Sequence, residues 1–200
     1  MTGTALIAAG LTVLALAWCG PLPVLVPASF AAHMTLHMIV VGIGAPLVAI
    51  GVAMRFAPML RPAAAFAAVL SVLDLAIVWG WHTPVLHDVA RGGSAGLWLE
   101  QGTFALVTFG LWLTAFAGPA IAGALALFMT SMHMTLLGAL LGLAPRPVYP
   151  AHDHVEHPLG LSAIADQQLG GAVMLAVGGV VYLVAGLWLT SRVLKRPAPR

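Results

Sequence analysis

Long apolar stretches recur along the whole chain and limit what it can fold into. They are long enough to cross the hydrocarbon core of a bilayer, which takes about 20 residues per helix. Of the 200 residues, 61% are hydrophobic and 7% are charged, whereas soluble domains carry roughly 25% charged residues. The mean hydropathy is +1.02. Such a chain cannot present a water-soluble surface, so we predict an integral membrane protein.

The predicted fold class is all-α, an integral membrane helical bundle of about six transmembrane helices. Proline, glycine and charged residues separate the apolar stretches, as in the tight turn at Gly118-Pro119. Little chain remains outside the spans, so we expect a single transmembrane helical domain over residues 1–200. Residues 1–28 also fit a signal peptide, although no basic segment precedes the apolar run. The predicted spans lie near residues 4–24, 29–54, 64–82, 98–118, 121–143 and 164–191.

The basic residues give the predicted bundle an orientation. If the first residue lies in the cytoplasm, six basic residues fall inside, namely Arg55, Arg61, Arg192, Lys195, Arg196 and Arg200. Only Arg91 and Arg146 then fall outside. The positive-inside rule therefore favours cytoplasmic N- and C-termini. The net charge is only +2 and the basic residues are scattered, which excludes a nucleic-acid-binding protein.

Histidines lie within the apolar spans, toward the predicted outer face. His33 and His37 are one turn apart and share one face of the second span. His133 lies roughly 15 Å below the outer end of the fifth span, at 1.5 Å per residue. Ionisable side chains in hydrocarbon are costly and normally face the bundle interior with a partner or a function. These three histidines therefore favour a binding site in the outer half of the bundle.

Three further polar residues point toward the same region. His82 ends the third span, and Asp74 lies about 12 Å deeper on it. Asp166 opens the sixth span. His82 and Asp166 can equally sit in contact with interfacial water, and Asp74 can act by orienting a histidine instead of binding a metal itself.

The histidines have methionine neighbours, which indicates the kind of metal. The second span reads His33-Met34-Thr35-Leu36-His37-Met38, and Met129, Met132 and His133 share one face of the fifth span. Imidazole with thioether suits copper(I), although most methionines in an apolar protein serve packing. We therefore predict a copper(I) site, with candidate ligands His33, His37, His82, His133, Met38, Asp74 and Asp166.

The connection between the last two spans is a second candidate. It contains His152-Asp153-His154-Val155-Glu156-His157, and histidine-rich tracts bind divalent metals weakly. The same residues are equally consistent with a solvated polar loop.

Several of these motifs together resemble the CtaG-type cytochrome c oxidase assembly factors, a polytopic membrane family associated with caa-type oxidases. The motifs follow in the family's order and cover most of the chain from about residue 30 onward. They are HMTLHM with Gly44-Ala45-Pro46-Leu47; Trp81-His82-Thr83-Pro84-Val85-Leu86; Glu100-Gln101 with Phe104; Leu137-Gly138-Ala139 leading to Pro147-Val148-Tyr149-Pro150; and Asp166-Gln167-Gln168-Leu169-Gly170-Gly171 with Met174.

The resemblance implies a non-enzymatic protein of the bacterial inner membrane that helps to mature a haem-copper oxidase. Its partner would be an oxidase subunit, to which it would supply copper. By position, the resemblance singles out His33, His37, His82 and Asp166. Gln101 stands where a histidine often follows the glutamate in the family, so the resemblance assigns no ligand to the fourth span.

Two other functions remain open from the sequence. Paired histidines in a helical bundle also hold haem, as in b-type electron-transfer proteins. Asp74 and His133 could instead form part of a small transporter or a proton relay, because intramembrane ionisable residues often mark such paths. The sequence leaves the oligomeric state undetermined.

Overall fold

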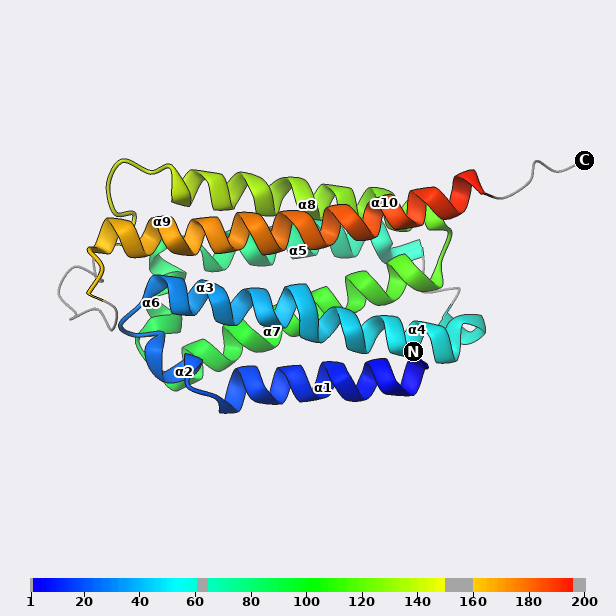
Figure 1. Ribbon diagram of the computed structural model, residues 1–200, viewed down its shortest axis with the longest axis horizontal. Helices are drawn as coiled ribbons and strands as arrows, with labels where there is room; N and C mark the ends of the chain where they lie inside the picture. Colours follow the sequence, from blue (N-terminus) through cyan, green and yellow to red (C-terminus); the bar gives the residue numbers. More distant parts are fainter. Residues whose placement is uncertain (1, 61–64, 150–159, 196–200) are drawn as a thin grey trace, which may run out of the picture.

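The protein is a bundle of helices in the computed structural model, which describes residues 2–60, 65–149 and 160–195. Every regular element within these residues is helical (Figure 1). In chain order, the elements are α1 (Gly3–Cys19), α2 (Leu22–Leu25), α3 (Phe30–Ile39), η1 (Val40–Gly44), α4 (Ala45–Leu60), α5 (Ala67–Trp81), α6 (Pro84–Arg91), α7 (Ser94–Ala117), α8 (Ala120–Gly142), α9 (Ala163–Val173), η4 (Met174–Gly179) and α10 (Val180–Leu194).

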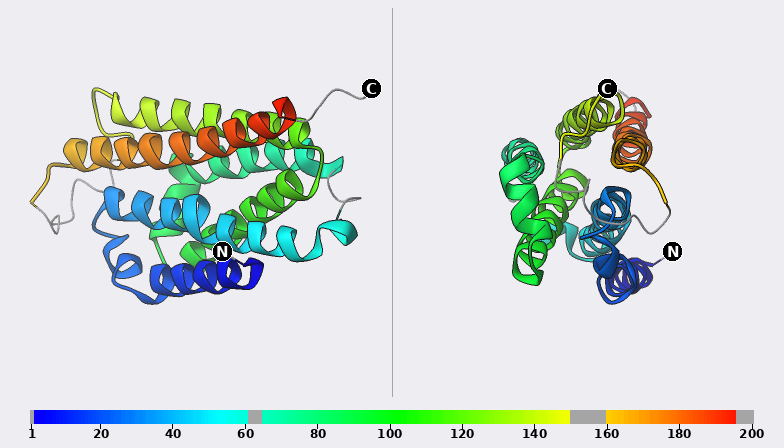
Figure 2. Two further views of the ribbon diagram at one scale, coloured as in Figure 1. Left: turned by 45° about the vertical axis from the view of Figure 1, so that its right-hand side comes forward. Right: turned by 90° about the vertical axis from the view of Figure 1, so that its left-hand side faces the viewer.

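The long helices run along the longest axis of the molecule, and the end-on view shows them packed as a bundle (Figure 2). Helix α1 packs on α4, α4 on α7, α3 on α9, and α8 on α9 and α10; α5 packs on α7 and α8. Helices α2 and α6 and the start of α9 lie together at one end (Figure 1), which we name the site end. The C-terminal end of α10 lies at the opposite end.

Four helical segments are long and apolar enough to cross a membrane: Gly3–Leu25, Phe30–Phe56, Ala120–Gly142 and Ala163–Leu194. The pair Ala67–Trp81 and Pro84–Arg91, bent by 75°, makes a fifth if it counts as one span. Each predicted span coincides with a helix or a chain of helices, but the predicted number of about six is not confirmed. The fourth predicted span corresponds to α7, whose hydropathy is lowered by Glu100 and Gln101.

Two of the long helical segments contain a π-helical turn, and each turn is bonded by a side chain from another helix. In the first, η1, the hydroxyl of Tyr182 donates to the carbonyl of Val41 at 3.0 Å. Pro46 follows this turn and has no backbone N–H to offer to the preceding carbonyls. In the second, η4, Ser131 Oγ donates to the carbonyl of Gly179 at 2.8 Å. These bonds satisfy carbonyls that the irregular turns would leave exposed to an apolar interior.

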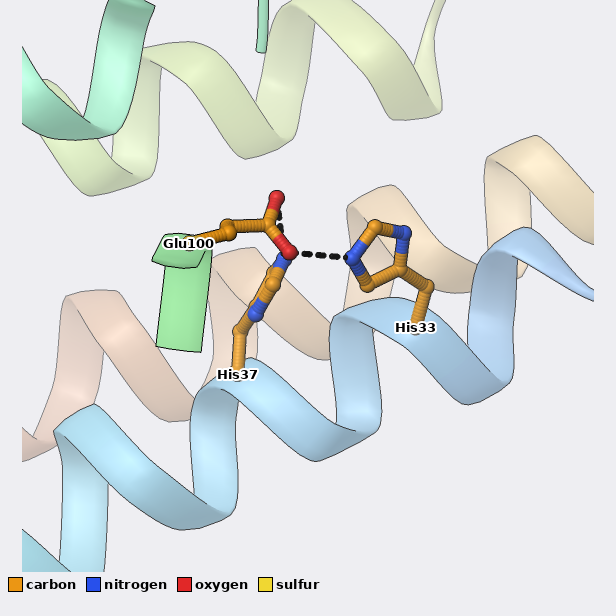
Figure 3. Close-up of side chains that lie close together, drawn as sticks. All are labelled: His33, His37 and Glu100. Carbon is orange, nitrogen blue, oxygen red and sulfur yellow. Dashed lines mark hydrogen bonds and ion pairs between the residues drawn. The ribbon is translucent and has the colours of Figure 1, made fainter. Parts of the chain in front are cut away.

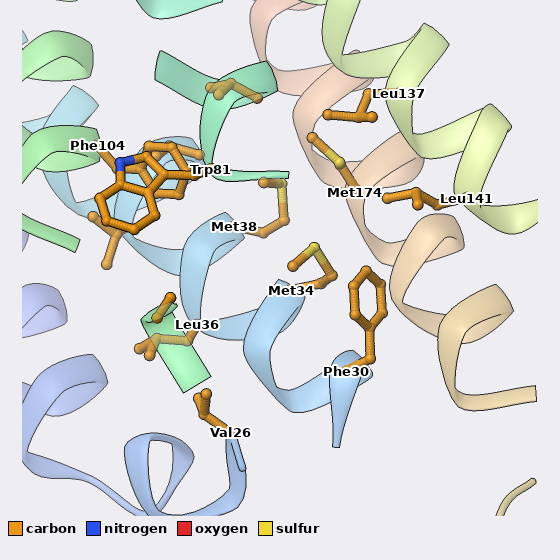
Figure 4. Packing of buried hydrophobic residues seen from close by; sticks show 14 of the residues in the cluster. Val26, Phe30, Met34, Leu36, Met38, Trp81, Phe104, Leu137, Leu141 and Met174 are labelled. Carbon is orange, nitrogen blue, oxygen red and sulfur yellow. The ribbon is translucent and has the colours of Figure 1, made fainter. Parts of the chain in front are cut away.

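Two apolar clusters fill the bundle. The cluster nearer the site end includes four methionines, and Figure 4 shows three of them, Met34, Met38 and Met174, pointing into the same part of the core. Phe30, Trp81 and Phe104 also belong to it, together with Val26, Leu36, Leu137 and Leu141. The second cluster surrounds Trp112, Leu127 and Tyr182. The candidate site described next borders the first cluster.

Candidate metal centre

The position of α3 is set by a carboxylate from another helix. Asp166, in the first turn of α9, accepts hydrogen bonds from the backbone N–H groups of Phe30 at 2.6 Å and Ala31 at 3.0 Å. It also accepts from Ser29 Oγ at 2.9 Å, and Ser29 in turn caps α3 through the N–H of Ala32. A negative charge at a helix N-terminus is stabilising. Asp166, predicted as a candidate ligand, therefore anchors the helix that carries His33.

The side chains of His33, His37 and Glu100 converge one to two helical turns from the contact between Asp166 and the start of α3. His33 and His37 lie next to each other along α3, with ring centroids 4.3 Å apart and planes at 52°, as their spacing predicts. Glu100 approaches them from α7 (Figure 3). Its Oε2 lies 2.7 Å from Nε2 of His33, and its Oε1 lies 3.4 Å from Nε2 of His37. All three side chains are buried, and one ligand atom from each lies within 4.8 Å of the others.

Gln101 holds the ring of His37 from the other side. The indole N–H of Trp18 donates to Gln101 Oε1 at 3.4 Å, so the Gln101 amide group faces Nδ1 of His37, at 2.7 Å. Nε2 of His37 and Oε1 of Glu100 lie 3.4 Å apart without forming a hydrogen bond, and Nδ1 of His33 has no hydrogen-bond partner among the described residues. Buried polar atoms without a partner are costly. The arrangement therefore has the donor atoms, and the unmet bonding capacity, for one metal ion.

Helix α6 covers this cluster. Its His87 is fully buried and lies against the ring of His33, with centroids 5.0 Å apart and planes 25° apart. Tyr149 packs on the other side of His87 at 4.1 Å, and its hydroxyl donates to the backbone carbonyl of His82 at 2.9 Å. Burial raises the pKa of Tyr149, so its hydroxyl stays protonated at neutral pH. Arg91 ties the end of α6 to the carbonyl of Pro27 at 2.6 Å.

Gln167, the residue after Asp166, is hydrogen-bonded to the segment that carries Tyr149. Its Oε1 accepts from the N–H of Val148 at 2.6 Å, and its Nε2 donates to the carbonyl of Leu141 at 3.1 Å. The end of α8 and the start of the following connection are thereby fixed to α9.

His82 lies beside the cluster and contacts a sulfur atom. Its Nδ1 bonds the carbonyl of Val78 at 2.7 Å, and its Nε2 lies 3.4 Å from Sδ of Met34. The rings of His82 and His37 have centroids 6.0 Å apart. His82 is thus near His33 and His37, as the sequence predicts, although it contacts Met34 directly instead of Glu100.

His133 and Asp74 form a separate pair between α8 and α5. Nε2 of His133 lies 3.1 Å from Oδ2 of Asp74, and both side chains are buried. The metal-capable group formed by His33, His37 and Glu100 does not include them. The methionines predicted to share the face of His133 point outward, since Met129 is 53% exposed and Met132 is 67% exposed.

Met38 is buried in the first apolar cluster, close to Gly178 of η4. Its role as a copper ligand stays a prediction. The candidate loop with His152, His154 and His157 lies outside the described residues.

Sequence reasoning missed four residues of this region as site residues: Met34, His87, Glu100 and Gln101. A glutamate inside an apolar span was the available signal for Glu100. The family resemblance assigned no ligand to that span, yet α7 brings a carboxylate between the two histidines.

Comparison with known proteins identifies the family. The family model described as cytochrome c oxidase caa3 assembly factor (Caa3_CtaG) matches residues 2–196. No curated protein and no solved structure matches the chain. Because the match covers nearly all of the chain, this protein belongs to the cytochrome c oxidase caa3 assembly factor family.

Proposed function

We propose that this oxidase assembly factor holds copper between His33, His37 and Glu100 and delivers it to a subunit of a haem-copper oxidase. The observation that carries the proposal is the convergence of two imidazoles and one carboxylate, all buried, with ligand atoms within 4.8 Å of one another. In this account copper is a cargo that the protein passes on by ligand exchange, and the protein is not an enzyme.

The donor set supports copper. Imidazole suits zinc, copper, iron and nickel, and copper(II) has the highest affinity among divalent first-row metals for a given nitrogen and oxygen site. Glu100 supplies a negative charge that offsets the charge of an ion in an apolar bundle. Gln101 lies 2.7 Å from Nδ1 of His37, and its side-chain oxygen, once the amide is turned to accept from Nδ1–H, would orient a metal-bound His37.

The charge distribution supports a site that faces away from the cytoplasm, in a bacterial inner membrane. Among the described basic residues, Arg55, Arg192 and Lys195 lie near the end opposite the site, and Arg91 and Arg146 lie at the site end. The positive-inside rule then favours an orientation with the site end outside. Copper could reach an extracytoplasmic oxidase domain from there without crossing the rest of the bundle.

A haem between the paired histidines does not fit the geometry. The rings of His33 and His37 are 4.3 Å apart on one helix, with a carboxylate against them, and leave no room for a macrocycle between them. The transporter alternative rests on Asp74 and His133, which form a separate pair. Metal-independent transport in proteoliposomes would favour that alternative.

Copper retention tests the proposal. Detergent-purified protein is loaded with copper(I) or, in a parallel sample, with copper(II), then desalted and subjected to elemental analysis, alongside His33→Ala/His37→Ala, Glu100→Gln and the control His133→Asn. We expect wild type and the control to retain copper. The other two variants should each retain at least one copper ion fewer per protein. Absence of retained copper in wild type, or equal retention in all variants, would overturn the proposal.

A further inference from the structure

The second helical segment presents two adjacent rows of metal-capable side chains. His33 and His37 form one row, and Met34 and Met38, each one residue further along, form the other. The imidazole row faces Glu100 and Gln101 of α7. The thioether row points into the first apolar cluster (Figure 4), where Met34 is fully buried. Buried methionines usually fill space, so position alone assigns no further role to this row.

The contact between Met34 and His82 brings together two atoms that can each offer a lone pair to a metal. The carbonyl of Val78 can only accept a hydrogen bond, so Nδ1 of neutral His82 carries the proton in their 2.7 Å bond. Nε2 therefore bears a lone pair, and this atom lies 3.4 Å from Sδ of Met34. A thioether sulfur is also only an acceptor. Two lone-pair atoms thus face each other in a buried place with no proton between them.

The separation of these two atoms matches a shared metal ion. With bonds of about 2.0 Å to nitrogen and about 2.3 Å to sulfur, as at zinc sites, a tetrahedral angle places the two donors roughly 3.5 Å apart. The observed distance is 3.4 Å. The spacing of the pair, which is also that of van der Waals contact, is therefore compatible with a shared ion.

We infer that Met34 and His82 form a second metal site, selective for copper(I), next to the first. Both donors are neutral, and the ring of Phe104 lies 6.4 Å from that of His82, so the surroundings favour a soft monovalent ion over a divalent one. The ring of His37 lies 6.0 Å from that of His82 and places the two sites side by side. The inference rests on the proposed function. It adds to that function the oxidation state of the copper ion held at the second site.

X-ray absorption at the copper edge tests the second site, because the first site contains no sulfur. The protein is loaded with copper(I) and compared with Met34→Leu, which conserves volume, and with Met174→Leu, which alters an equally buried methionine of the same core. We expect two retained copper ions per wild-type protein, with a sulfur neighbour in the scattering. Met34→Leu should keep one copper with nitrogen and oxygen neighbours only, and Met174→Leu should match wild type.

The outcomes separate this inference from the proposed function. Copper in wild type with only nitrogen and oxygen neighbours, or a sulfur signal unchanged in Met34→Leu, would overturn the second site and leave the first standing. A sulfur signal that persists in Glu100→Gln would support the second site by itself. Size-exclusion profiles of the variants show whether each one is folded.

Discussion

The carboxylate of Asp166 accepts the backbone N–H of Phe30 at 2.6 Å and so joins the first turn of α9 to the first turn of α3. Through this bond a residue far along the chain sets the height and rotation of the helix that carries His33 and His37. The metal site is therefore held by packing between helices that only the folded bundle brings together.

Replacing Asp166 should loosen this anchor. Asp166→Asn keeps the size but removes the charge that faces the start of α3, so we expect a loss of about 1–2 kcal/mol in stability. Copper affinity should fall as well, because α3 carries two of the ligands. Thermal unfolding in detergent measures the first effect, and competition with a copper(I) chelator measures the second. Asp88→Asn, at an exposed position of α6, is the matched control; an equal effect there would contradict the anchoring role.

Gln101 should tune copper affinity without binding copper. Gln101→Leu removes the amide whose oxygen must turn to accept from Nδ1–H of His37 when Nε2 binds copper, and loss of such an outer partner typically costs about 10–100-fold in metal affinity. The measurement is a chelator competition, and Gln168→Leu, an exposed position on α9, serves as the control. Unchanged affinity in Gln101→Leu would show that the amide does not orient the ring.

The pair of His133 and Asp74 should matter for stability and not for copper. His133→Leu removes the hydrogen-bond partner of the buried Asp74 carboxyl group, and a buried polar group left without a partner costs about 1–3 kcal/mol. The double variant His133→Leu/Asp74→Leu should recover much of the loss, since no buried polar group is then left without a partner. Melting temperatures of the single and double variants give the comparison. Loss of copper from the double variant while it remains folded would place this pair in the metal site.

Close packing between glycines of α8 and α9 should be required for the stability of the bundle. A Cβ at Gly138 would lie 2.7 Å from the backbone nitrogen of Leu175 and 2.9 Å from the carbonyl oxygen of Gly171. Gly138→Ala should therefore destabilise the bundle by about 1–3 kcal/mol. In Gly102→Ala the added methyl group meets nothing within 4 Å, and the better helix propensity should leave stability equal or higher. Equal melting temperatures for the two variants would contradict this packing.

Parts of the fold could be predicted because they depend on local sequence. Apolar stretches with proline and glycine between them located the helices, including the end of the third span at His82. The 75° bend into α6 and the π-helical turn before Pro46 depend on how the chain packs. The number of spans was uncertain for a physical reason: Glu100 and Gln101 lower the hydropathy of α7 and face the bundle interior instead of the bilayer.

The site was predictable only along single helices. The spacing of His33 and His37 determined that their rings lie next to each other on one face of α3. No local pattern could show that Glu100 meets them, because that contact depends on the packing of α7 against the second helical segment. Likewise, the partner of His82 is a sulfur from another helix, and the carboxylate of Asp166 is taken up by backbone N–H groups.

Copper transfer to the oxidase tests the central claim most directly. The purified assembly factor is loaded with copper(I), mixed with the copper-free, copper-binding subunit of the caa3-type oxidase, and separated from it for elemental analysis of both. We predict that copper moves from wild type to the subunit, and that Glu100→Gln delivers little. Copper that stays on the assembly factor, or a subunit that acquires equal copper from wild type and Glu100→Gln, would contradict the account.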